Sequence, residues 1–298
     1  MNKETRFLPK APQQINKWSS LIPAAFVLTW SSGAIFVKLG LQYANPFTFV
    51  FLRFLISTAV LWIICLSARS PYPKSGKEWG YVILTGLLLQ AGYQIFYFIA
   101  LNNHLAPGIL AIILGAQPII TAFFAATKIR YGQWSGLFLG LSGLVLVVAD
   151  HISAPHFPLS GLASALLCLG CITAGTFMQK RIKLSQPVNM AIQYSGGLLV
   201  ILLLLPFFGG WQVHWSPVFL LSLSWMSLVI SVGASMMLYF LIQKGNLTNV
   251  TSLFYGVPPV TALFDYLIFH DPLSLLAFSG MLLIVFGLVL IHRRGTAL

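Results

Sequence analysis

Residues Trp30-Ser-Ser-Gly-Ala-Ile-Phe-Val-Lys38 and Cys171-Ile-Thr-Ala-Gly-Thr-Phe-Met-Gln179 are two versions of one pattern, displaced by 141 positions. Gly-Ala in the first segment aligns with Ala-Gly in the second, and the two phenylalanines coincide. The same displacement aligns three further pairs: Pro46 with Pro187, Gly92 with Gly233 and Pro118 with Pro259. A repeat that covers most of a chain predicts two similar structural halves.

The composition is that of a membrane protein. The 298 residues are 58% hydrophobic and 7% charged, with a mean hydropathy of +0.87, whereas about a quarter of the residues of a soluble domain are charged. Ten apolar stretches are each long enough, at roughly 17–25 residues, to cross a hydrocarbon layer of about 30 Å. They lie at 20–38, 46–67, 79–101, 106–126, 134–149, 159–179, 188–208, 218–242, 248–269 and 273–291.

The sequence therefore predicts an all-α membrane protein with ten transmembrane helices. Each half holds five spans, an odd number, so the two halves must insert in opposite orientations, as two inverted five-helix repeats (5+5). Inverted repeats of this kind are typical of secondary transporters. We expect a disordered cytoplasmic tail over 1–17, a first repeat over 18–150 and a second, inverted repeat over 151–298.

The basic residues are concentrated in every second loop between the predicted spans. Apart from Lys38 and Arg53, every Lys and Arg lies in the first tail, in the loops after spans 2, 4, 6 and 8, or at the end of the chain. The positive-inside rule then places both termini in the cytoplasm. The formal charge of +12 thus reflects topology, and no nucleic-acid partner is expected.

Charged residues within a bilayer are costly and mark functional sites by default. Arg53, Lys38 and Asp265 are expected at similar depth, in the outer third of the membrane. Arg53 is either a structural cation, paired with Asp265 or reaching the headgroups, or an anchor for a substrate carboxylate or phosphate. Lys38 and Asp265 are candidates for an ion pair or for proton coupling.

Span 3 carries a polar stripe of Gln90, Tyr93, Gln94 and Tyr97, whose spacing places them on one helix face. Such a face should not contact lipid, where its hydrogen-bonding groups would lack partners. It either joins packed helices or lines a water-filled cavity, and we favour the cavity.

Prolines interrupt two spans at corresponding places, Pro118 in span 4 and Pro258-Pro259 in span 9. Each removes a helix hydrogen bond, and broken helices in matching positions indicate the binding site of an inverted-repeat transporter, although kinks also occur in spans that bind nothing. Gln117 and Tyr255 flank the breaks and are therefore candidate ligand-binding side chains.

The glycines of spans 5 and 10 (Gly136, Gly140, Gly143, Gly280 and Gly287) are spaced for close helix packing. We expect spans 5 and 10 to pack together, with a homodimer contact as the alternative. Motifs of enzymes are absent from the sequence, the three cysteines fall within spans, and no catalytic residue, metal or cofactor is predicted.

The quoted Trp30–Lys38 segment resembles the first-span motif of the EamA-type ten-span proteins in the drug/metabolite transporter (DMT) superfamily. Asn45-Pro-Phe-Thr-Phe-Val-Phe-Leu-Arg-Phe54, Ala100-Leu101 and the glycine-rich fifth span are similar to the segments that follow it. The resemblance implies two inverted five-helix units around a cavity that opens alternately to each face. It also implies a bacterial inner (plasma) membrane location and the export of amino acids or other small metabolites.

Our first hypothesis is export of a neutral, aromatic or acidic amino-acid-like solute, since Lys38 and Arg53 outweigh Asp265 in the outer cavity. The alternatives are a translocase for lipids or lipid-linked carriers, and a membrane receptor or assembly subunit. Aromatic side chains could stack on an apolar part of the solute. The expected substrate-binding residues are Trp30, Arg53, Gln90, Tyr93, Gln94, Tyr97, Gln117, Tyr239 and Tyr255.

Overall fold

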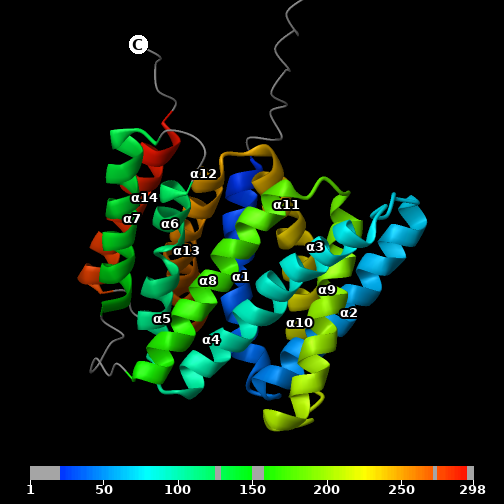
Figure 1. The fold of residues 1–298 in the computed structure, drawn as a ribbon. Helices are drawn as coiled ribbons and strands as arrows, with labels where there is room; N and C mark the ends of the chain where they lie inside the picture. Colours follow the sequence, from blue (N-terminus) through cyan, green and yellow to red (C-terminus); the bar gives the residue numbers. More distant parts are fainter. Residues whose placement is uncertain (1–20, 125–128, 150–157, 271–273, 294–298) are drawn as a thin grey trace, which may run out of the picture.

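The computed structural model describes residues 21–124, 129–149, 158–270 and 274–293. Within these ranges the regular secondary structure is helical, apart from one isolated antiparallel β-bridge between Ala44 and Val213. The helices run roughly side by side and form one bundle (Figure 1). The predicted tail over 1–17 lies outside the described residues.

The helices of the first half follow the predicted spans, with one interruption. Their bounds are α1 Ile22–Gly40, α2 Pro46–Ala68, α3 Gly76–Gly86, the π-helix η2 Leu87–Gly92, α4 Tyr93–Asn102, α5 Pro107–Leu114, α6 Gln117–Phe123 and α7 Tyr131–Ala149. Local sequence explains several starts. The side chain of Asn45 accepts a hydrogen bond from the backbone of Thr48, and Pro46 takes the first helical position of α2, as N-terminal capping favours.

The second half repeats this order. Its bounds are α8 Leu159–Arg181, α9 Gln186–Leu204, the 3₁₀ turn η3 Leu205–Phe207, α10 Pro217–Ser224, the π-helix η4 Trp225–Ala234, α11 Ser235–Lys244, α12 Leu247–Ser252, the 3₁₀ turn η5 Leu253–Gly256, α13 Val257–Phe269 and α14 Leu275–His292. Contacts cross between the halves, because α2 packs along α9, α4 along α8 and α1 along α13.

Eight helices of the described chain are long and apolar enough to cross a membrane. The two other predicted spans, 106–126 and 248–269, are present as broken helices: α5 with α6, and α12 with η5 and α13. The breaks fall where the prolines were expected to cause them. Pro118 cannot donate to the carbonyl of Leu114, and Pro258 cannot donate to that of Phe254, so neither helix continues through this point.

Helices α7 and α14 are in intimate contact through glycine, as the spacing predicted. A Cβ atom at Gly143 would lie 2.5 Å from the carbonyl oxygen of Gly280, and one at Gly136 would lie 2.6 Å from that of Gly287. Since only glycine permits this approach, these faces are occupied within the chain. The predicted homodimer has no support from them and stays a prediction.

Candidate functional site

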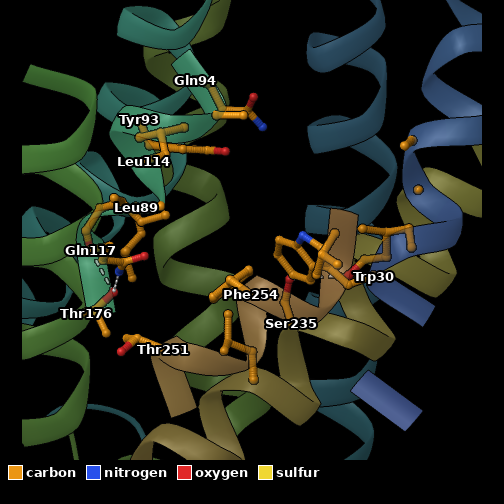
Figure 2. Close-up of a pocket in the computed structure, with 18 of the residues that line it drawn as sticks. Trp30, Leu89, Tyr93, Gln94, Leu114, Gln117, Thr176, Ser235, Thr251 and Phe254 are labelled. Atoms are coloured by element: carbon orange, nitrogen blue, oxygen red, sulfur yellow. Dashed lines mark hydrogen bonds between the residues drawn. The ribbon is translucent and has the colours of Figure 1, made fainter. Parts of the chain in front are cut away.

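A cavity of about 390 Å³ lies at the centre of the bundle. Its walls come from both halves: α1, α2, η2 with α4, the α5–α6 break, α8, α9, η4 with α11, and the α12–α13 break. This volume is within the range of small-molecule sites, roughly 300–1,000 Å³. Figure 2 shows Trp30 and Phe254 facing Tyr93, Leu114 and Gln117 across the open space.

Most of the predicted binding residues line this cavity. They are Trp30, Arg53, Gln90, Tyr93, Gln94, Gln117, Tyr239 and Tyr255, together with the helix-breaking Pro118 and Pro258. Tyr97 lies outside it and packs edge-on against Phe98. Tyr97 lies one turn beyond Tyr93 in the same regular helix, α4, and its ring contacts that of Tyr93, so it is on the predicted face but past the end of the cavity. Pro259 also lies outside the lining.

Arg53 is half-buried in the wall formed by α2. Its Nε donates to the hydroxyl of Ser231 at 2.5 Å, and this hydroxyl in turn donates to the carbonyl of Met226 at 2.9 Å. Glu78 and Asp265 are the acidic residues that the structure describes, and neither pairs with Arg53. The anticipated alternative of an Arg53–Asp265 pair is wrong, because Asp265 lies 3.6 Å from the Nζ of Lys38 instead.

Lys38 and Asp265 form their ion pair away from the cavity lining, between α1 and α13. Their side chains are 50% and 31% exposed. An ion pair of this exposure contributes little to stability, about 0–1 kcal/mol. The ion-pair interpretation of these two residues is therefore supported by geometry, while a role in proton coupling stays a prediction.

A chain of buried hydrogen bonds leads from the cavity into the protein. The amide of Gln90 donates to the hydroxyl of Tyr239 at 3.0 Å, and that hydroxyl donates to Gln193 at 2.8 Å. The amide of Gln193 then donates to Gln179 and to Asn189, each at 2.7 Å. Because Gln90 and Tyr239 are buried and hydrogen-bonded to each other and to Gln193, their orientation at the cavity is fixed.

The two broken helices are linked to each other and to their surroundings. The hydroxyl of Tyr255, next to the second break, donates to the carbonyl of Gly115 in the first break at 2.8 Å. Gln117 donates to Thr176 of α8 at 3.2 Å, a bond drawn as a dashed line in Figure 2. A free backbone carbonyl was expected near Leu114. The carbonyl of the next residue, Gly115, lies in the break and accepts a hydrogen bond from the side chain of Tyr255.

An aromatic group forms another part of the wall. Trp30 and Phe254 meet edge to face with ring centroids 5.5 Å apart, and Phe26 packs against both at 5.3 and 5.5 Å. Such geometry is the favoured one for aromatic pairs. The group provides a rigid apolar surface opposite the polar side chains of η2 and α6.

The two π-helices occupy corresponding places in the halves. Leu87–Gly92 shifted by 141 positions falls within Trp225–Ala234. Each borders the cavity, η2 through Leu89 and Gln90, and η4 through Met226 and Ile230. Isolated π turns inside α-helices are frequent at functional sites.

Sequence reasoning missed several side chains at or beside the site, namely Thr176, Gln193, Tyr194 and Thr251. Tyr194 donates to the backbone carbonyl of Ser231 at 3.0 Å and is fully buried. The repeat held a signal for it, since Tyr194 is displaced by 141 positions from Arg53, as Ser231 is from Gln90. Gln193 carries no such signal.

Apolar spans and a central cavity with walls from both halves define a helical membrane protein of the transporter class. A solved crystal structure has the same fold, with a TM-score of 0.78 at 21% identity over 92% of this chain and 98% of that chain. The EamA-like transporter family model matches residues 17–149 and, a second time, 159–293. The chain belongs to the EamA-like transporter family, within the DMT superfamily, and is a membrane transporter of small-molecule solutes.

Curated relatives of similar length are distant in sequence. The chain is 23% identical to the uncharacterized transporter YvbV of Bacillus subtilis, over 94% of this chain and 93% of the relative. It is 24% identical to a probable amino-acid metabolite efflux pump of Escherichia coli, over 88% of this chain and 90% of the relative. An Archaeoglobus fulgidus transporter is 25% identical over 93% of this chain.

Proposed function

We propose that this transporter exports neutral, aromatic or acidic amino-acid-like solutes by alternating access. The observation that carries the proposal is the position of Arg53, a half-buried cation in the cavity wall that pairs with neither described acidic residue. A guanidinium carries five N–H donors, and Ser231 takes the one on Nε. The remaining donors match the geometry of a carboxylate, which guanidinium groups bind in bidentate fashion.

The rest of the cavity suits the other parts of such a solute. Trp30 and Phe254 offer an apolar surface for its side chain. The amides of Gln94 and Gln117 offer neutral oxygen acceptors for an amino group. No carboxylate lies among the lining residues of the described chain, so a solute with a second positive charge would be disfavoured beside Arg53. A distant relative in E. coli, named a probable amino-acid metabolite efflux pump, adds weight to this solute class.

We further propose that the broken helices serve as spans four and nine of a ten-span, inverted 5+5 protein. Two correspondences at 141 positions support this proposal, the breaks at Gly115 and Gly256 and the two π-helices. The family model also matches the chain twice, once in each half. The positive-inside distribution of Lys and Arg supports cytoplasmic termini in a bacterial inner membrane.

For alternating access, we propose a cytoplasmic gate between the end of α8 and the end of α11. Lys180 donates through Nζ to the carbonyls of Gln243 and Gly245 at 3.0 and 2.6 Å. The amide nitrogens of Gln179 and Asn189 are buried without a partner in the described chain. Buried donors without partners are costly, so water that enters on opening would compensate for the broken contacts.

Counterflow in proteoliposomes tests the proposal. Vesicles loaded with a neutral, aromatic, acidic or basic amino acid are given the same labelled solute outside, for the unmodified protein, Arg53→Gln and Lys38→Gln. Lys38→Gln is the matched control, because it removes a cation of similar depth outside the cavity. We expect accumulation of the first three classes, its loss in Arg53→Gln by about tenfold or more, and its retention in Lys38→Gln.

Two results would contradict the proposal. Undiminished accumulation by Arg53→Gln would remove this residue as the anchor. No accumulation of any amino acid by folded, unmodified protein would exclude the solute class and favour a lipid-linked cargo.

A further inference from the structure

A second cavity, of about 580 Å³, lies at the end of the bundle where the α2–α3 loop meets the α8–α9 turn. It is separate from the central cavity and shares none of its lining residues. Its lining includes four basic side chains, Lys74, Lys77, Arg181 and Lys183. The fold and the proposed transport leave this cavity without a role.

The positive charge of this cavity is uncompensated. Within the described chain, none of the four basic side chains has a hydrogen bond or an ion pair, in contrast to nearby Lys180. Glu78 is the one acidic residue in the lining, and its carboxylate accepts a hydrogen bond from the backbone N–H of Lys74 at 2.7 Å. That carboxylate therefore stabilises the start of α3, and the basic residues outnumber it.

The floor of the cavity is apolar. Val82 and Ile182 lie beneath it with 2% and 5% of their surfaces exposed. At its rim, Tyr72 stacks on Trp62 with ring centroids 6.2 Å apart. Tyrosine and tryptophan in this arrangement are typical of the boundary between hydrocarbon and water. A ligand that fits both the basic side chains and the apolar floor has an anionic headgroup and an apolar tail.

Exposed apolar side chains on α2 and α3 offer a surface for the apolar tail of such a ligand. On the two helices joined by the loop that lines the cavity, Ile63 and Leu66 of α2 and Ile83 and Leu84 of α3 are exposed, and both helices belong to candidate spans. A soluble phosphate compound would make no use of these residues. Acyl chains would cover them. The positive-inside topology places this end at the cytoplasmic leaflet, whose anionic lipids attract clustered Lys and Arg near the membrane surface.

We propose that this cavity binds the headgroup of an anionic phospholipid, with the phosphate held by Lys77, Arg181 and their basic neighbours. The occupant is a lipid of the surrounding leaflet. The site is independent of the transported solute, so the central cavity can be disabled without affecting it.

Native mass spectrometry of the full chain in detergent tests the proposal. The protein is titrated with phosphatidylglycerol, with phosphatidylcholine, and with phosphatidylglycerol in the presence of excess glycerol 3-phosphate. The variants are Lys77→Gln, the double variant Lys77→Gln/Arg181→Gln, and Lys244→Gln as the matched control. Lys244 is an exposed basic residue at the end of α11 that does not line this cavity.

We expect phosphatidylglycerol to be retained in preference to phosphatidylcholine, and glycerol 3-phosphate to leave it bound. Retention should fall about fivefold for Lys77→Gln and further for the double variant, since each basic residue near an anionic surface contributes comparably. Lys244→Gln should match the unmodified protein. Equal losses for Lys244→Gln and Lys77→Gln would show diffuse surface attraction and overturn the proposal. Displacement by glycerol 3-phosphate would overturn it in favour of a soluble ligand.

Discussion

Substituting Gly143 by alanine tests how α7 and α14 are held together. The added Cβ would lie 2.5 Å from the carbonyl oxygen of Gly280 and 2.9 Å from the backbone nitrogen of Ile284. Ordinary contact begins at 3.4 Å, so two backbones would have to separate by about 0.9 Å, an overpacking that typically costs 1–3 kcal/mol. We expect Gly143→Ala to lower the free energy of unfolding by about this amount.

The assay is reversible unfolding of the purified protein in mixed micelles with increasing denaturing detergent. Gly170→Ala is the control, because Gly170 lies mid-helix in α8 and a Cβ there would meet nothing within 4 Å. Alanine is the better helix former, so this control should be neutral or stabilising by up to about 1 kcal/mol. Equal stability of Gly143→Ala and Gly170→Ala would refute the argument that backbone contact fixes this helix pair.

Two further predictions concern hydrogen bonds and charge. Tyr239→Phe removes the hydroxyl that bridges Gln90 and Gln193, and should destabilise the protein by about 1–3 kcal/mol because two buried amide groups lose their partner; an unchanged unfolding transition in the same assay would contradict this. Asp265→Asn breaks the partly exposed pair with Lys38, so stability should change by less than about 1 kcal/mol. Solute accumulation driven by a pH gradient should persist in this variant, and its selective loss would instead assign proton coupling to Asp265.

The all-helical membrane class and the places of the apolar helices could be predicted from the sequence, because a long apolar stretch reports directly on the membrane. The positions of the helix breaks were also predictable, since Pro118 and Pro258 remove specific backbone donors. The sequence was less informative on whether each proline would kink its helix or divide it into two separate helices. A span that ends and restarts within one turn has the same composition as a continuous one, and the pattern of apolar residues does not distinguish them.

Most residues that line the cavity were predicted from the sequence, but the hydrogen-bond partners of these residues were not. The spacing of Gln90, Tyr93 and Gln94 correctly indicated a polar wall, but a regular helix period extended that wall to Tyr97. The helix period predicts which residues share a face but not how far along that face the cavity extends, so it could not exclude Tyr97. Arg53 was identified as unusual, whereas its hydrogen bond to Ser231 could not be predicted, because a serine in a span is usually bound to its own helix.

The paired π-helices have a mechanical consequence. Each closes its turn with bonds one residue longer than those of an α-helix; in η2 this is the bond from the N–H of Tyr93 to the carbonyl of Leu88. If such a turn tightened to the α form, the outer part of the span would rotate by about 100° relative to the inner part. The rotation would carry Ser231 away from Arg53 and release the guanidinium. Each half thus contains, beside the central cavity, a turn at which such a shift in register could occur.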